Sequence, residues 1–171
     1  MPTDRYRDFK YQKVVPYPAQ TVYNAVAAVH KYAEFVPWCI SSTILSRTDD
    51  GGELKTEISV GFRMLQSRFR STVSLTPPTR IHAVTEPNEH LEALSFTWVF
   101  MPVGEQSTRV DLELSFTLVS LEHCLMWDLA KKQITSEYLL CFTRRCAALA
   151  NEPPPPPGTD TTSTGSSTKS M

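Results

Sequence analysis

Two stretches of this sequence alternate between apolar and polar residues with a period of two. In residues 53–64 the even positions are apolar or threonine, and in residues 109–118 every even position is apolar. Because successive side chains of a strand point to opposite faces, both stretches predict β-strands with one dry and one solvated face. Strands of this kind belong to an antiparallel sheet whose dry face needs a cover.

The neighbouring segments predict further strands. The apolar phase changes from even to odd positions near residues 64–66, which indicates a turn or a bulge there. Residues 80–86 and 91–100 are two more strand-like segments bounded by turn signals, and residues 5–15 alternate well enough to form a first strand. Together these segments predict one strand near the start of the chain and about six more after residue 40.

Helical spacing marks three other segments. Pro18 suits the first turn of a helix, and apolar residues then repeat at helical spacing as far as His30. A second helical turn over residues 31–35 must stop before Pro37, because the residue before a proline is pushed out of the helical region. From about residue 120 to residue 150 a long helix is expected. Its apolar positions include Leu121, Leu125, Leu129, Ile134, Tyr138, Phe142 and Leu149.

The order of these elements predicts an α+β fold. A single long helix lying across a curved antiparallel sheet is the simplest cover for the dry face. Curvature leaves room between helix and sheet, and this room is either filled by side chains or hollow.

Composition and charge narrow the classes of function. The 171 residues predict one domain over residues 1–150 and a disordered Pro/Thr/Ser-rich tail over residues 151–171. A net charge of −1 without a basic cluster disfavours nucleic-acid binding, and no run of apolar residues is long enough to span a membrane. The four cysteines form no C-x-x-C pair and are expected to be reduced intracellular thiols; the histidines lack ligand spacing, so no metal site is expected.

The segment YAEFVPWCISS, residues 32–42, is unusually apolar for a turn. It gathers Phe35, Val36 and Trp38 around Pro37, which breaks any helix that would run through them. Large apolar side chains at a forced turn close either the protein core or a site for an apolar ligand.

Four motifs resemble a known family. They are YAEFVPWC at 32–39, HLEALSFTWVF at 90–100, LELSFTLVS at 112–120 and FTRRC at 142–146. Together with the order of elements, they resemble the coenzyme Q-binding protein family of the START-like, polyketide-cyclase-like superfamily. The resemblance implies the helix-grip fold, in which a curved antiparallel sheet wraps around a long C-terminal helix, with two short helices after the first strand.

The resemblance also implies a function. Members of the family bind ubiquinone (coenzyme Q) in the helix-grip cavity and act as lipid chaperones for respiratory electron transport and ubiquinone biosynthesis. No catalytic residue and no catalytic cofactor are therefore expected, and ubiquinone is the expected bound lipid. The resemblance further implies a location on the matrix side of the mitochondrial inner membrane, peripheral contact with that membrane, and respiratory or ubiquinone-biosynthesis proteins as partners. The first residues, MPTDRYRDFK, show no Arg/Ser-rich presequence.

Ten residues are the candidates for the ligand site. They are Phe35, Val36, Pro37, Trp38, Phe62, Trp98, Phe100, Phe116, Leu139 and Phe142. From pattern alone each is more simply explained as a core residue, and the resemblance favours a ligand role for residues 35–38. An apolar loop kinked by proline would form the mouth of the cavity at a lipid surface.

Two alternatives remain open. Bacterial members of the family have been described as toxins that interfere with ribosome subunit association, and a protein of this type would need a charged docking surface. An enzyme of the cyclase or hydratase kind would need a buried acid or base inside the cavity. The candidates for that role are His82, His90, Tyr11 and Tyr138, and the sequence identifies a partner for none of them.

Overall fold

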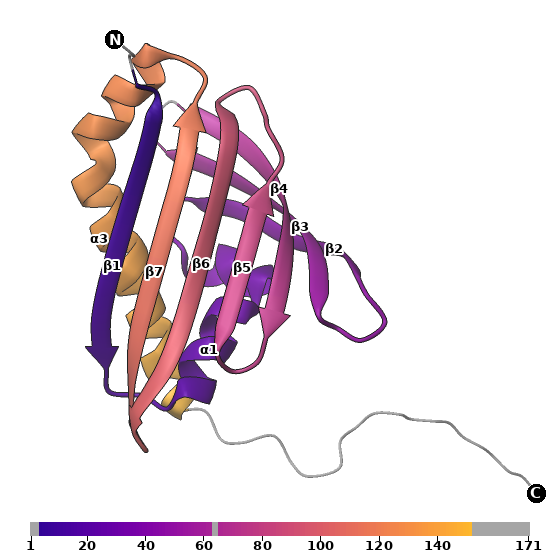
Figure 1. The fold of residues 1–171 in the computed structure, drawn as a ribbon, viewed down its shortest axis with the longest axis vertical. Helices are drawn as coiled ribbons and strands as arrows, with labels where there is room; N and C mark the ends of the chain where they lie inside the picture. Colours follow the sequence, from indigo (N-terminus) through magenta and orange to yellow (C-terminus); the bar gives the residue numbers. More distant parts are fainter. Residues whose placement is uncertain (1–3, 63–64, 152–171) are drawn as a thin grey trace, which may run out of the picture.

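The computed structural model describes residues 4–62 and 65–151, which form a curved sheet with helices behind it (Figure 1). The elements in chain order are β1 (Tyr6–Val15), α1 (Ala19–Ala27), the 3-10 turn η1 (Val29–Lys31), α2 (Tyr32–Phe35), β2 (Cys39–Arg47), β3 (Glu53–Phe62), β4 (Leu65–Thr76), β5 (Arg80–Thr85), β6 (Leu91–Gly104), β7 (Ser107–Leu118) and α3 (Leu121–Asn151). This order confirms the predicted α+β, helix-grip architecture. The predicted tail lies outside the described residues, apart from Asn151 at the end of α3.

The sheet is an open meander of β2 to β7, to which the first strand is added beside β7. Its strand order is β1-β7-β6-β5-β4-β3-β2, and all neighbouring strands are antiparallel. Strands β2 to β7 follow one another by hairpins, whereas β1 pairs with β7, so the first and last strands lie side by side (Figure 1).

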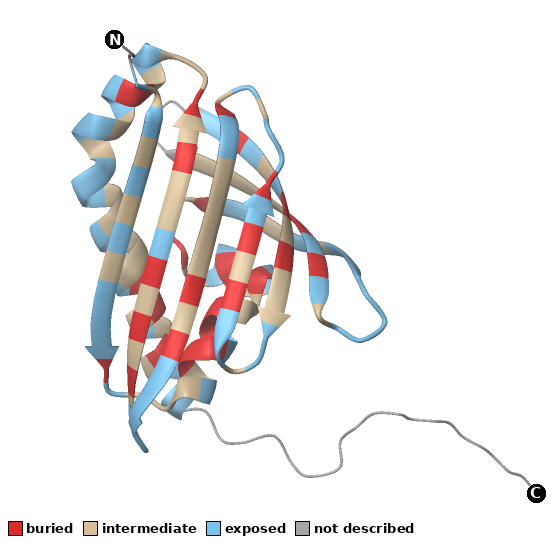
Figure 2. Cartoon of the chain, in the orientation of Figure 1, coloured by how far each residue is buried: buried red, intermediate tan, exposed pale blue. Residues whose placement is uncertain are grey.

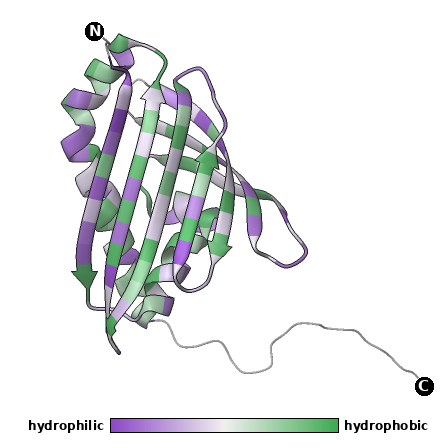
Figure 3. Ribbon diagram, in the orientation of Figure 1, coloured by the Kyte–Doolittle hydropathy of each residue, from purple (hydrophilic) through white to green (hydrophobic). Residues whose placement is uncertain are grey.

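The period-two pattern places side chains as predicted. In β7, Val110, Leu112, Phe116 and Leu118 are buried, and the alternation is visible as hydrophobic and hydrophilic bands along this strand in Figure 3. Strands β3 and β4 pair as far as Phe62 and Leu65, on either side of the predicted phase change. The turn or bulge predicted near residues 64–66 falls partly on residues 63–64, which lie outside the described residues.

The first helices form as their prolines require. Helix α1 begins directly after Pro18, which has extended dihedral angles (φ −62°, ψ 151°). It buries Val22, Tyr23, Ala25 and Val26 against the sheet and α3. Figure 2 shows buried segments concentrated where α1 lies behind the strands. Helix α2 is a single turn that ends at Phe35, two residues before Pro37.

The apolar interior has two separate parts. The larger cluster joins α1, α2 and the C-terminal half of α3 to the strands, and includes Val26, Phe100 and Phe142. The smaller cluster contains Leu91, Phe116, Leu118 and Cys124, with Trp127 packed against it. Helix α3 is therefore anchored at both ends, and of its residues only Cys124, Cys141, Phe142 and Cys146 are buried.

The first turns of α3 expose apolar residues. Leu121, Leu125 and Leu129 were predicted among the apolar positions of the helix, yet they are 53%, 64% and 87% exposed. In this half of the helix the core contacts are made instead by Cys124 and Trp127, which belong to the smaller cluster. None of the helices among the described residues is long and apolar enough to cross a membrane.

Candidate functional site

A cavity of about 490 Å³ lies between the sheet and α3. Every strand contributes to its wall, from Phe9 in β1 to Leu112 in β7, and α3 contributes residues from His123 to Tyr138. Most of the lining side chains are aliphatic or aromatic. The volume lies within the range of about 300–1,000 Å³ that is typical of small-molecule sites.

The cavity meets solvent along the first half of α3. Met126 and Leu129 both line the cavity, and they are 51% and 87% exposed. A residue that lines a cavity and is also largely exposed marks its opening. Leu125 and Leu121 lie one turn and two turns before Leu129, so the opening is bordered by an apolar helix surface.

The hydroxyl groups in the middle of the cavity are paired with protein atoms. The Ser71 and Thr85 hydroxyls are 2.7 Å apart, and the Thr56 hydroxyl donates to the Ser71 carbonyl oxygen at 3.5 Å. All three residues are buried. Because their hydrogen-bonding capacity is largely used within the sheet, this part of the wall offers little polar recognition.

Two histidines line the cavity beside the smaller core cluster. His90 immediately precedes β6, and His123 lies in the first turn of α3. Their ring centroids are 5.1 Å apart, with the ring planes tilted by 59°. His90 Nδ1 lies 2.9 Å from the Ser67 hydroxyl, and His123 Nδ1 lies 2.6 Å from the Ser120 hydroxyl.

Aromatic rings form the opposite end of the cavity. Trp38 stacks on Tyr138 with ring centroids 6.2 Å apart, and Tyr138 also contacts Trp98 and Phe142. Both Trp38 and Tyr138 line the cavity. Burial raises the pKa of Tyr138 well above its usual value, so this phenol stays neutral. The cavity therefore has one aromatic end and one end that carries imidazoles.

Of the ten residues predicted for the ligand site, three line the cavity: Val36, Trp38 and Phe116. Six others do not: Phe35, Pro37, Trp98, Phe100, Leu139 and Phe142. The side chain of Phe62 lies outside what the structure describes. Contact with a ligand remains a prediction for all ten.

The loop after α2 is packed inward. The Phe35 ring contacts Tyr32 and Phe142 at centroid distances of 5.7 and 5.2 Å, and the Arg145 guanidinium lies over it at 5.4 Å. Val36 is 5% exposed, whereas Pro37 is exposed. The predicted mouth at residues 35–38 is therefore not supported, because the large side chains of this loop close the core and one wall of the cavity.

Pattern reasoning missed the cavity-lining face of α3. This face includes His123, Met126, Trp127, Ala130, Ile134 and Tyr138, with Leu129 and Thr135 at its edges. Their spacing of three or four residues marks one face of a helix, so the signal was present in the sequence. What the sequence lacked was the position of the gap beneath that face.

The four acid–base candidates occupy different places. His90 and Tyr138 line the cavity, whereas Tyr11 packs against the larger core and His82 does not reach the cavity. His82 Nδ1 is 2.8 Å from the Thr97 hydroxyl on the neighbouring strand. His90 gains partners that the sequence did not reveal, Ser67 and His123.

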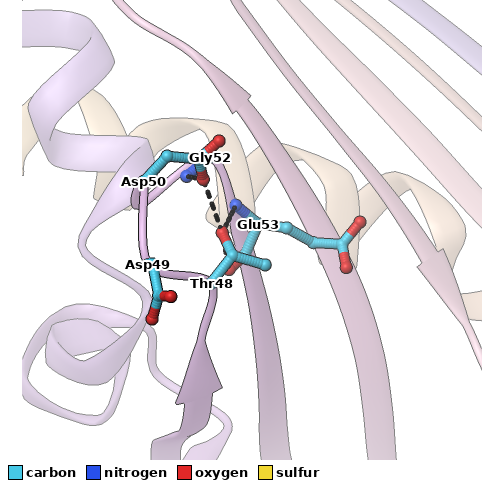
Figure 4. A pocket seen from close by; sticks show the side chains of 5 residues that line it. All are labelled: Thr48, Asp49, Asp50, Gly52 and Glu53. Carbon is cyan, nitrogen blue, oxygen red and sulfur yellow. Dashed lines mark hydrogen bonds between the residues drawn. The ribbon is translucent and has the colours of Figure 1, made fainter.

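A second depression lies at the turn between β2 and β3 (Figure 4). The Thr48 hydroxyl donates to Asp50 Oδ1 at 2.7 Å, and the same Asp50 oxygen accepts the Gly52 N–H at 2.8 Å. Gly51 supplies the positive φ of 74° that this turn requires. Thr48, Asp49, Asp50 and Glu53 are exposed, so the depression is a solvent-exposed hairpin turn without the enclosure of a ligand site.

Comparison with known proteins identifies relatives of two kinds. Residues 15–143 match the protein family described as polyketide cyclase / dehydrase and lipid transport. The ribosome association toxin RatA of Pseudomonas aeruginosa is 31% identical over 103 residues, which cover 60% of this chain and 69% of the toxin. The mitochondrial coenzyme Q-binding protein homolog B of Xenopus laevis is 27% identical over 145 residues, which cover 83% of this chain and 59% of that protein.

Solved structures share the fold at lower identity. The Zhui aromatase/cyclase of Streptomyces sp. R1128 superposes with a TM-score of 0.76 at 16% identity, covering 85% of this chain and 96% of the cyclase. At this identity the likeness concerns the fold alone.

Proposed function

Because the chain belongs to the polyketide cyclase / dehydrase and lipid transport family, as a member similar to the coenzyme Q-binding proteins, we propose that it is a ubiquinone carrier. The quinone, or a similar isoprenoid lipid, occupies the cavity between the sheet and α3. The protein acts by shielding this lipid from water and presenting it elsewhere, without chemistry of its own.

The observation that carries this proposal is the apolar cavity with an apolar opening. Burial of each methylene group stabilises a bound lipid by about 0.8 kcal/mol. A wall of aliphatic and aromatic side chains therefore offsets much of the free energy that the lipid loses when it leaves the membrane. The volume of about 490 Å³ suits a quinone ring and the first part of an isoprenoid tail. The remainder of a long tail leaves past Met126 and Leu129, where the wall opens.

In the same proposal, the first half of α3 contacts the membrane. The exposed residues Leu121, Leu125, Met126 and Leu129 present one apolar face of the helix beside the opening. An apolar helix face of this kind inserts shallowly at a lipid–water interface. A lipid would then pass between bilayer and cavity without crossing water.

The proposed place of action is the matrix side of the mitochondrial inner membrane. The name of the Xenopus laevis relative supports a mitochondrial location, and its coenzyme Q-binding role supports respiratory or ubiquinone-biosynthesis proteins as recipients. Fractionation of cells that express the full chain tests this location; recovery outside mitochondria would contradict it.

A substitution in the cavity wall tests quinone binding. Ala130 lines the cavity from α3, and replacing it by phenylalanine places a ring in the space that the proposal assigns to the lipid. We expect Ala130→Phe to abolish most of the ubiquinone recovered with the purified protein. The measurement is organic extraction followed by mass spectrometry.

The matched control is Ala148→Phe. Ala148 is on the same helix but is exposed and outside the cavity wall, so this variant should keep its quinone. Absence of any isoprenoid lipid from the unmodified protein, or equal recovery from both variants, would contradict the proposal.

Association with the ribosome is a second candidate function. It is favoured by the 31% identity to the RatA toxin. Expression of the full chain followed by polysome profiling separates the two candidates: accumulation of free subunits supports ribosome association, and an unchanged profile together with bound quinone supports the carrier.

An enzyme of the cyclase or hydratase type is a third candidate. The observation in its favour is the pair of imidazoles inside the cavity, since a base in a ligand cavity is what such an enzyme needs. Mass spectrometry of a ligand before and after incubation tests it, because a carrier returns its ligand chemically unchanged.

A further inference from the structure

We infer that His90 and His123 form a polar site within the cavity, which binds the oxygen atoms of a carbonyl-bearing ring. This inference rests on the proposed function and adds to it the orientation of the ligand. Both histidines line the cavity, and they come from elements that are far apart in the sequence. The ring of the ligand lies between sheet and helix at this site, and its tail extends over the apolar wall.

His90 is held in place by a chain of hydrogen bonds. Asn88 Oδ1 accepts the backbone N–H groups of His90 and Leu91 at 2.8 and 2.9 Å. Asn88 Nδ2 donates to the Ser67 hydroxyl oxygen at 3.2 Å, and this hydroxyl lies 2.9 Å from His90 Nδ1. Ser67 is 7% exposed, so the imidazole is fixed from inside the protein.

His123 is held by a shorter version of the same arrangement. The Ser120 hydroxyl oxygen accepts the backbone N–H of His123 at 3.2 Å, and it lies 2.6 Å from His123 Nδ1. Serine at this position caps the start of α3, so the same side chain begins the helix and orients the ring.

We assign one tautomer to each neutral imidazole. Each serine oxygen accepts an N–H, and in this assignment the serine hydroxyl donates its own proton to Nδ1. With Nδ1 accepting, the proton of a neutral imidazole resides on Nε2. Glu89 Oε1 lies 3.5 Å from His90 Nδ1, but Glu89 is largely exposed and the serine is closer.

Both Nε2–H groups are therefore available to a ligand. Among residues 4–62 and 65–151, neither Nε2 atom has a hydrogen-bond partner. Two donors at one end of a mostly apolar cavity match a neutral ring that carries neighbouring oxygen acceptors, such as a quinone. A fatty acid fits less well, because the wall contains neither lysine nor arginine to balance its carboxylate.

The test compares two probes that share one tail. Decylubiquinone carries ring oxygens, whereas decylbenzene has the same ten-carbon tail on a ring without oxygen. We expect His90→Phe and His123→Phe each to weaken decylubiquinone binding by about tenfold, the effect of one lost hydrogen bond, and to leave decylbenzene binding unchanged. The affinities for both probes are measured by isothermal titration calorimetry on the full chain.

His82→Phe is the matched control, because His82 lies outside the cavity wall and should affect neither probe. A second measurement follows the carbonyl stretch of bound decylubiquinone in the infrared. We expect this band at lower frequency in the unmodified protein than in the double variant His90→Phe/His123→Phe, since hydrogen bonding weakens the carbonyl bond.

The outcomes separate this inference from the proposed function. If the unmodified protein binds decylubiquinone and the histidine variants bind it equally well, the inference of a polar site is wrong, but the proposed carrier function still stands. Loss of both probes in the variants would also overturn the inference, because the histidines would then support the cavity rather than bind oxygen. If the unmodified protein binds neither probe, the carrier proposal itself fails.

Discussion

Among single residues, aromatic side chains fall into two groups that the sequence does not separate. Phe96, Trp98 and Phe100 share one face of β6, yet only Phe96 lines the cavity. Trp98 and Phe100 are covered by the larger core, where Trp98 lies 5.5 Å from Phe142 and Phe100 lies 5.8 Å from Tyr23. Alternation fixes the face of each side chain, and the position along the strand decides between core and cavity.

The buried thiols give a prediction about alkaline stability. Burial raises the pKa of Cys141 to about 12 and that of Cys146 to about 11, against about 8.5 for a thiol in an unfolded chain. Such groups stabilise the fold fully below the unfolded pKa, and this contribution is lost as the pH rises through the folded values. We expect the denaturant midpoint to fall between about pH 8 and pH 11.

The variant Cys141→Ala/Cys146→Ala should lose less stability over the same pH range, although it starts from a lower midpoint. Chemical denaturation at several pH values measures both slopes. Equal slopes in the variant and the unmodified protein would show that other groups govern the alkaline loss.

Among the elements, α3 is supported differently along its length. At its start, Arg7 in β1 forms a paired contact with Asp128, at 3.0 Å for both bonds, and Trp127 packs edge-on against Phe116 at 4.9 Å. Near its end, Phe142 lies in the larger core. Between these anchors the helix faces the cavity on one side and solvent on the other.

The exposed apolar face of α3 gives a prediction about membranes. Replacing Leu125 and Leu129 by aspartate removes apolar surface and adds negative charge beside the opening. We expect this double variant to lose most of its binding to anionic lipid vesicles while its unfolding midpoint stays nearly unchanged, because both side chains are more than half exposed. Vesicle flotation measures the binding.

Leu140→Asp provides the control for this effect. Leu140 is on the same helix and is 47% exposed, but it lies beyond the opening and does not line the cavity. Vesicle binding should survive in this variant. Equal loss in both would mean that general charge repulsion, rather than this helix face, determines binding.

The sequence predicted the elements better than it predicted the site. The alternation in β3 and β7 and the helical spacing of α3 depend on local geometry, so they could be read directly. The exposure of Leu129 and the inward packing of Phe35 depend on how far the helix stands from the sheet, and no local pattern records that distance. The pairing of His90 with His123 likewise needs the fold, since 32 residues separate them.

At the scale of the whole molecule, the cavity lies between the two core clusters. A ligand bound there contacts both and should therefore stabilise the folded protein. A ligand that binds only the folded protein stabilises it by about 2.7 kcal/mol at a hundredfold excess over Kd. For a domain of this size, this corresponds to a rise in Tm of roughly 5–10 °C. We expect decylubiquinone to raise Tm by this amount, measured by circular dichroism.

Ala130→Phe should show no such rise, because its cavity is filled by the new ring. If the ligand raised the Tm of this variant as much as that of the unmodified protein, binding would have to occur somewhere other than under α3.

Between Asp128 and Tyr138 no residue of α3 is buried, and none belongs to either core cluster, so this part of the helix can mutate without loosening either anchor. Substitutions in these turns can therefore change which ligands the cavity binds, while residues elsewhere maintain the fold. A fold of this kind favours evolutionary change in ligand specificity, because substitutions in one segment of one helix are enough to alter the cavity.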